Sequence, residues 1–166
     1  PTIKKFSSYI ETTASPSIQI ESITLENYPL SFSQERLLFI EQYTGGTNAY
    51  HLPLLFEVNQ DININLLKQS IILLANRHDV LRTLFKSSEN GIYHQVVMNE
   101  EIKIQEYSSS SADIYSQIDS DVNRPFNLTT EYPLRICFYY NSKDNKYLLL
   151  INRHHIASDG WSRVIL

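Results

Sequence analysis

Two adjacent histidines near the end of the chain are the residues best suited to chemistry. His154 and His155 follow an apolar run, and Asp159 and Gly160 come shortly after them in the segment HHIASDG. An imidazole takes and gives protons near neutral pH, and a positioned one accelerates a reaction by about 10²- to 10⁴-fold. Successive strand residues point to opposite faces. We therefore expect one histidine to face a cavity and the other to be structural.

Metal binding and a purely structural role are the alternatives for this segment. Histidine and aspartate are both zinc ligands, but a zinc site requires converging ligands, whereas adjacent strand histidines diverge. The spacing therefore disfavours a metal. On spacing alone, two hydrogen-bonded histidines at the end of a strand explain the pattern as well as catalysis does.

Asp159 is suited either to orient an imidazole or to pair with an arginine, and Gly160 to let the backbone turn tightly beside it. Arg77, Arg82 and Arg135 lie beside apolar runs. An unpaired buried charge would cost several kcal/mol, so a buried arginine needs an acidic partner. Asp159 is the partner that the sequence suggests.

The elements that must position these residues alternate helix and strand patterns without an internal repeat. Ser31 and Gln34 form a capping box, and the pair Gly45-Gly46 is suited to end the helix that begins there. Two further helices are predicted, one over residues 63–78 and one around 114–122 that must stop before Pro125. Predicted strands cover residues 51–58, 81–85, 92–98, 134–140 and 146–152.

The last two of these strands form a hairpin that delivers the chain into HHIASDG. This order predicts an α+β fold, a mixed sheet with packed helices rather than regular βαβ repetition.

Composition and charge exclude several classes of protein. The chain has 166 residues, 14 basic against 18 acidic side chains and a net charge of -4, which argues against nucleic-acid binding. The longest apolar run, at 71–75, is far shorter than the roughly 18 residues of a membrane span. Cys137 is the single cysteine and lies in an apolar run, so we expect a buried, inert thiol in a reducing compartment. A cytoplasmic protein is expected.

From residue 28 to residue 166 the sequence resembles the N-terminal half of a condensation domain from a nonribosomal peptide synthetase. Four motifs in order carry the resemblance: SFSQERLLFI at 31–40, RHDVLRTLF at 77–85, RPFNL with PLR at 124–135, and HHIASDGWS at 154–162. HHxxxDG alone occurs in other acyltransferases, whereas the ordered set is specific. The resemblance implies the N-terminal lobe of a chloramphenicol-acetyltransferase-like fold.

The resemblance also implies a role for each residue of the last motif. His155 would face the tunnel and contact the attacking amine, as a general base or by positioning it, and His154 would be structural. Asp159 would hold the loop through a salt bridge, with Arg82 as the first choice of partner and Arg77 as the second. Gly160 would allow the thioester to approach closely.

The implied reaction is amide bond formation between a donor acyl or peptidyl thioester and an acceptor amino acid. Each would be tethered through 4'-phosphopantetheine to an upstream or downstream peptidyl carrier domain, and no cofactor would bind this chain directly. Residues 1–11 resemble the last helix of a carrier domain, and residues 12–27 are predicted to be a linker. Residues 28–166 would be a truncated lobe. The missing C-terminal lobe would supply the other wall of the tunnel, so we expect the piece alone to be inactive.

Two alternatives stay open. A related HHxxxDG acyltransferase or an epimerization domain would keep the fold and change the chemistry, although the first motif looks more like that of condensation domains joining two L-residues. A module that docks carriers without catalysis would keep the fold and lack the reaction.

Overall fold

The computed structural model describes residues 2–4, 23, 25, 27–109 and 113–162. The carrier-like helix predicted at 1–11 and the linker predicted at 12–27 lie almost entirely outside the described residues. Those two boundaries stay predictions.

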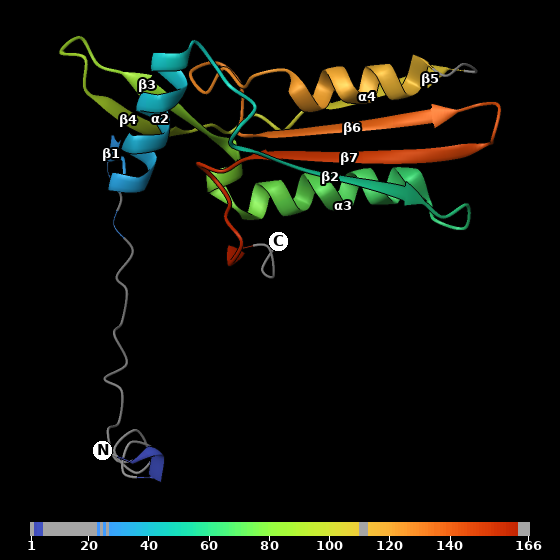
Figure 1. Ribbon diagram of the computed structural model, residues 1–166, viewed down its shortest axis with the longest axis horizontal. Helices are drawn as coiled ribbons and strands as arrows, with labels where there is room; N and C mark the ends of the chain where they lie inside the picture. Colours follow the sequence, from blue (N-terminus) through green and yellow to red (C-terminus); the bar gives the residue numbers. More distant parts are fainter. Residues whose placement is uncertain (1, 5–22, 24, 26, 110–112, 163–166) are drawn as a thin grey trace.

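A four-stranded mixed sheet forms the long body of the molecule (Figure 1). The hairpin predicted from sequence lies in its middle, and the outer neighbours come from much earlier in the chain. β5 runs parallel to β6, and the other two pairings are antiparallel. In spatial order the strands are β2 (His51–Val58), β7 (Lys146–His154), β6 (Leu134–Asn141) and β5 (Ile104–Ser109).

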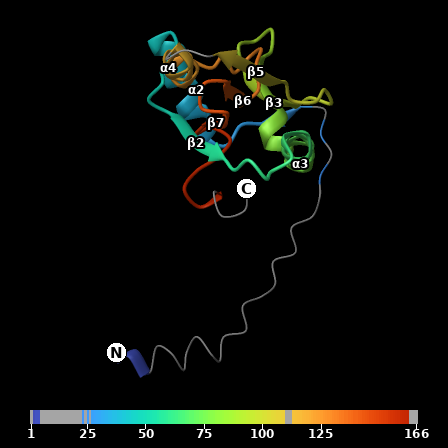
Figure 2. The ribbon, with the colours of Figure 1, turned by 90° about the vertical axis from the view of Figure 1, so that its right-hand side faces the viewer.

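Two helices cover opposite faces of this sheet, α3 (Ile64–Arg77) and α4 (Asp113–Asn123), as the end-on view shows (Figure 2). The alternation of β6 explains this arrangement. Its residues Ile136 and Phe138 pack with α3, whereas Cys137 and Tyr139 pack with α4. A strand buried on both faces reads as the continuous apolar run seen in the sequence.

A smaller three-stranded sheet lies beside the helix of the first motif. Its order is β1 (Tyr28–Pro29), β4 (Tyr93–Val97) and β3 (Thr83–Ser87), and the short 3-10 helix η1 (Asp79–Arg82) leads into β3.

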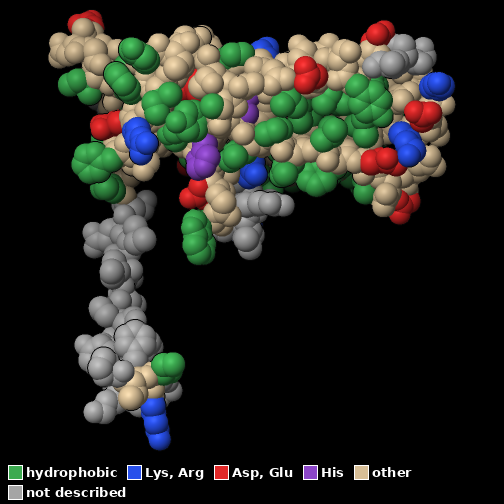
Figure 3. Space-filling view, viewed as in Figure 1, with side chains coloured by type: hydrophobic (Ala, Val, Ile, Leu, Met, Phe, Trp, Pro, Cys, Tyr) green, Lys and Arg blue, Asp and Glu red, His purple; other side chains and the backbone are tan. Residues whose placement is uncertain are grey.

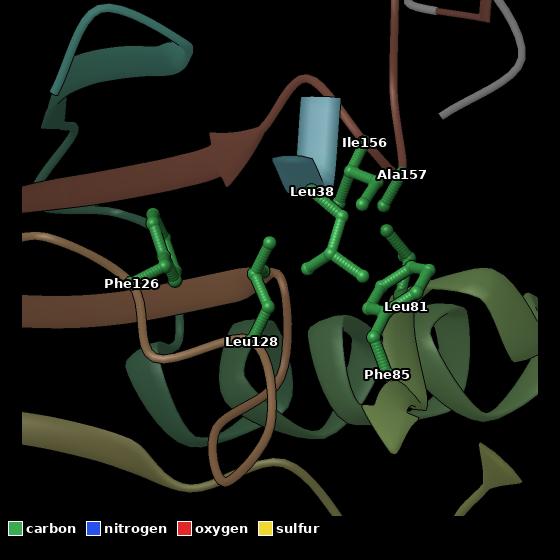
Figure 4. Packing of buried hydrophobic residues seen from close by; sticks show 7 residues of the cluster. All are labelled: Leu38, Leu81, Phe85, Phe126, Leu128, Ile156 and Ala157. Carbon is green, nitrogen blue, oxygen red and sulfur yellow. The ribbon is translucent and has the colours of Figure 1, made fainter. Parts of the chain in front are cut away.

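Helix α2 (Phe32–Thr44) begins at the capping box of Ser31 and Gln34 and ends at Gly45, whose φ of 71° is left-handed. Both cap predictions are confirmed. Leu38 of α2 packs in one apolar cluster with Leu81, Phe85, Phe126, Leu128, Ile156 and Ala157 (Figure 4). This cluster packs α2 against the segment that follows β7.

The predicted α+β class with a mixed sheet and packed helices is confirmed, and two local predictions were wrong. Residues 81–82, predicted as strand, belong to η1. The strand β5 is not among the predicted strands, and it ends at Ser108 and Ser109. The segment IQEYSS is largely polar and has no clear strand pattern of its own. It forms a strand because it pairs with β6, which comes from a distant part of the chain.

Large apolar side chains stay exposed along both β2 and α3, among them Leu55 and Phe56 of β2 and Leu66 and Leu73 of α3. Figure 3 shows hydrophobic side chains gathered on the viewed face, over the region of the four-stranded sheet. A gathering of this kind favours association. Among the described helices, none has both the length and the apolar character needed to span a bilayer.

Candidate active site

The two adjacent histidines lie on opposite sides of the chain at the end of β7. His154 is the last residue of the strand, is 0% exposed and lies directly opposite His51 of β2. His155 is exposed and lines a hollow of about 640 Å³. Strand alternation therefore separates the two imidazoles, as the sequence indicated.

The hollow lies between helix α2 and the turn that follows β7. The N-terminal half of α2 supplies one wall with Ser33, Gln34, Arg36 and Leu37, together with the cap residue Ser31. Tyr50, which precedes β2, stands beside them. The other wall consists of His155, Ile156, Ala157, Ser158, Asp159 and Ser162. An accessible imidazole thus faces a cavity with both polar and apolar walls, which small substrate groups can enter.

Both ring nitrogens of the buried His154 are hydrogen-bonded. Nδ1 accepts from the backbone N–H of Ile156 at 3.1 Å, and Nε2 lies 3.2 Å from Oε1 of Glu41. Because Nδ1 accepts, the proton of the neutral ring must be on Nε2, which donates to the carboxylate. Burial lowers the pKa of His154 below its usual 6.5, against the opposing influence of Glu41.

Backbone hydrogen bonds hold the turn that carries His155. The N–H of His155 donates to the carbonyl oxygen of Tyr50 at 2.8 Å, and the N–H of Ala157 donates to that of His154 at 3.0 Å. On the buried side, the ring of His154 lies 6.2 Å from His51 and 5.9 Å from Phe126. The turn is therefore tied to the loop before β2 and packed against aromatic rings.

Asp159 lies at the hollow but is exposed, and its recorded partner is local. Its Oδ1 accepts from the N–H of Ser162 at 2.8 Å, and its own N–H donates to Oγ of Ser162 at 2.8 Å. These reciprocal bonds have the form of a helix N-cap. The bonds from Ser162, above all from its backbone N–H, lower the pKa of Asp159 below 3.8.

The predicted ion pair of Asp159 with Arg82 is wrong, because Arg82 is buried elsewhere and pairs with Asp79 of its own motif at 2.8 Å. The second choice, Arg77, is exposed in the last turn of α3 and does not line the hollow. The other acceptors of the Arg82 guanidinium are the backbone oxygens of Ala75, Asn76 and Met98. Arg82 of η1 thus contacts the end of α3 and the residue that follows β4.

Two other predicted residues have clear positions. A Cβ at Gly160 would meet no described heavy atom within 4 Å, and the φ of Gly160 is not left-handed, so the fold itself does not require glycine there. Arg135 is buried, and its guanidinium pairs with Glu131 at 3.4 Å and stacks over the ring of Phe126. Within the described part of the chain, no cluster of three His, Cys, Asp or Glu is placed to hold a metal.

Glu41, which directly follows the first motif, is a site residue that was not predicted. Glu41 is 6% exposed on the inward face of α2, three residues after Leu38, and the signal for it was an acidic residue at a position where the helical period requires an apolar one. Its second oxygen accepts from the N–H of Thr47 at 3.1 Å. A buried carboxylate needs partners, and here they come from two other segments.

Comparison with known proteins extends this description. The family described as "Condensation domain" matches residues 24–166. The beauvericin nonribosomal cyclodepsipeptide synthetase of Beauveria bassiana is 36% identical over 140 residues, covering 82% of this chain and 4% of the synthetase. Gramicidin S synthase 2 of Aneurinibacillus migulanus is 30% identical over 168 residues, covering 100% of this chain and 4% of the synthetase.

Solved structures show the same fold. The starter condensation domain of the rhizomide synthetase superposes with a TM-score of 0.72 at 17% identity, over 85% of this chain and 35% of that one. The X-domain in its complex with OxyB from teicoplanin biosynthesis superposes with a TM-score of 0.76 at 21% identity, over 87% of this chain and 32% of that one.

The chain thus spans about a third of these solved chains and a few per cent of the synthetases. The matched region includes α2, the buried His154 and the hollow beside His155. This chain belongs to the condensation domain family found in nonribosomal peptide synthetases.

Proposed function

We propose that these residues form part of a catalyst that joins a donor acyl or peptidyl thioester to an acceptor amino acid. The observation that carries this proposal is the exposed imidazole of His155 in a hollow of about 640 Å³, in a chain of the condensation family. The acceptor nitrogen attacks the donor carbonyl carbon, the C–N bond forms and the C–S bond breaks. The donor thiolate leaves and takes up the proton lost by the nitrogen.

His155 contacts the attacking amine in this reaction, as a general base or by orienting it. Orientation by itself supplies a large share of the barrier reduction in such reactions, and a positioned base adds about 10²- to 10⁴-fold. Asp159 caps the turn after His155 through Ser162, and Gly160 leaves space for the thioester. His154 holds the turn from the buried side.

The partners and the tether are part of the proposal. Peptidyl carrier domains on either side present the two substrates as thioesters of 4'-phosphopantetheine, and the reaction takes place in the cytoplasm. Because this chain covers only 35% of a solved condensation chain, we propose that residues outside these 166 supply the opposite wall of the site. On this view the 166 residues alone do not catalyse the reaction.

The test compares the complete condensation domain with its His155→Ala variant, using loaded donor and acceptor carriers. We expect peptide formation to fall by about 10²- to 10⁴-fold with little change in the melting temperature. His94→Ala is the matched control, because His94 is half-buried in β4 and does not line the hollow. Peptide formation at the parent rate by His155→Ala would remove the catalytic role.

A docking role without catalysis is the second candidate, and the structural likeness to the X-domain favours it. That domain was solved in complex with OxyB. The same assay separates the two functions, since a docking module binds carriers but forms no peptide. An epimerization domain would instead return an inverted amino acid on the same carrier.

A further inference from the structure

Glu41 is a buried carboxylate outside the four recognised motifs, and it joins two walls of the hollow. It belongs to α2, whose first turns line the hollow with Ser33, Gln34, Arg36 and Leu37. Its Oε1 contacts Nε2 of His154 at 3.2 Å, at the start of the turn that forms the opposite wall. Glu41 and His154 are 6% and 0% exposed. This hydrogen bond therefore connects the helix to the turn out of reach of water.

The hydrogen bonds of His154 leave one tautomer for its ring. The N–H of Ile156 donates to Nδ1, so the ring proton is on Nε2 and donates to Glu41. An acceptor at Nε2 favours this tautomer, because the alternative ring would place two donors together at Nδ1 and two acceptors together at Nε2. Glu41 thereby controls whether His154 can accept the Ile156 N–H.

The Ile156 N–H bond fixes the residue that follows His155 in the chain. Leu38 also contacts this region through the apolar cluster that includes Ile156 and Ala157 (Figure 4), but apolar contacts have no preferred direction. A hydrogen bond between buried groups does have one. The bond between Glu41 and His154 thus adds a directional contact from α2 to the backbone bonds of His155 and Ala157 that hold this turn.

We propose that Glu41 is a positioning residue, which sets the tautomer of His154 and through it the geometry of the turn that presents His155 to the hollow. The proposal rests on the proposed function for its consequence in catalysis. The hydrogen-bond arrangement that it describes is independent of that function. Glu41 touches no reacting atom, and its effect on the reaction passes through His154.

The experiment uses the full-length protein that contains these residues and compares Glu41→Leu with Glu41→Gln. Leucine removes the acceptor for Nε2–H, and we expect kcat to fall by about 10- to 100-fold with KM for the loaded carriers nearly unchanged, since a small misplacement of a reacting group has costs of this size. Glutamine keeps a carbonyl oxygen for Nε2–H and loses only the bond to Thr47. We therefore expect Glu41→Gln to recover most of the kcat.

Asp121→Leu is the matched control, because Asp121 of α4 is a similarly buried carboxylate that accepts from Tyr139 of β6 and does not line the hollow. All variants are assayed at a temperature where each is folded. We expect Asp121→Leu to lower the melting temperature and to keep the parent kcat. A kcat of Glu41→Leu equal to that of Asp121→Leu would overturn the positioning role.

Two measurements separate a failure of this inference from a failure of the proposed function. Nitrogen NMR of labelled histidine reports the tautomer of His154, and amide hydrogen exchange reports the protection of the Ile156 N–H. We expect the proton on Nε2 in the parent, and faster Ile156 exchange in Glu41→Leu than in Glu41→Gln. A proton on Nδ1, or equal exchange in the two variants, would overturn the inference whatever the activity. A parent that forms no peptide but gives both expected signals would refute only the proposed function.

Discussion

Two buried carboxylates, Glu41 behind the hollow and Asp121 on the inner face of α4, differ in what lies next to them. Asp121 accepts from the hydroxyl of Tyr139 at 2.8 Å and from Gln117 at 3.0 Å, beside the apolar cluster between α4 and the sheet. Glu41 accepts from His154, and the next residue along the chain, His155, is exposed in the hollow. Similar buried hydrogen bonds therefore stabilise a packed core in one region and an accessible site in the other.

The thiol of Cys137 shows the character of the region under α4. Cys137 is 0% exposed, and burial raises its pKa to about 11. A thiol with so high a pKa is protonated and inert near neutral pH, as expected from its apolar run. Ionisable groups become useful to a reaction only where the fold brings them to an accessible surface, and among these two regions only the hollow does so.

The largest difference between the two regions is expected from removing the neutral partner of each carboxylate. His154→Leu leaves two buried groups without a partner, Oε1 of Glu41 and the Ile156 N–H, although Glu41 keeps its bond from Thr47. Tyr139→Phe removes a single bond from Asp121, which keeps its bond from Gln117. We expect losses in unfolding free energy of about 3 to 5 kcal/mol for His154→Leu and about 1 to 3 kcal/mol for Tyr139→Phe. Urea unfolding of the chain measures both. Equal losses would show that His154 is no more than an ordinary core residue.

A smaller effect is expected from pH. Burial holds the pKa of His154 in the folded protein below its unfolded value of 6.5. The unfolded chain therefore binds the extra proton first, and the stabilisation that is complete above pH 6.5 is lost as the pH falls below it. The slope from this one group is at most about 1.4 kcal/mol per pH unit. Urea unfolding is measured at about pH 7.5 and at about pH 5.5, roughly one unit on each side of that pKa. The free energy of unfolding should change less between these two pH values for His154→Gln than for the parent.

The smallest effect is expected at the exposed edge of the hollow. Asparagine caps a helix about as well as aspartate does, so Asp159→Asn should leave the melting temperature nearly unchanged. Asp79→Asn, which weakens the recorded partner of Arg82, should lower it more. A larger fall in melting temperature for Asp159→Asn than for Asp79→Asn would support an ion pair between Asp159 and Arg82 and would contradict the local hydrogen bonds of Asp159.

Much of the fold could be predicted because its signals are local. The capping box at Ser31, the helical period of α3 and the hairpin of β6 and β7 depend on residues close together in the chain. The separation of His154 from His155 follows from strand alternation in the same way. β5 was missed because a polar strand becomes recognisable only beside its partner, and that partner lies about 30 residues further along the chain.

Most of the elements, the family and the opposite orientation of the two histidines follow from the amino-acid order, since periodicity and ordered motifs are properties of neighbouring residues. Which charged and polar groups meet is set by the packing of distant segments. Glu41 reaches His154 across 113 positions of the chain, and Arg82 pairs with Asp79 rather than with Asp159. Hydrogen bonds between buried groups depend on distances of a few tenths of an ångström, and packing alone sets those distances.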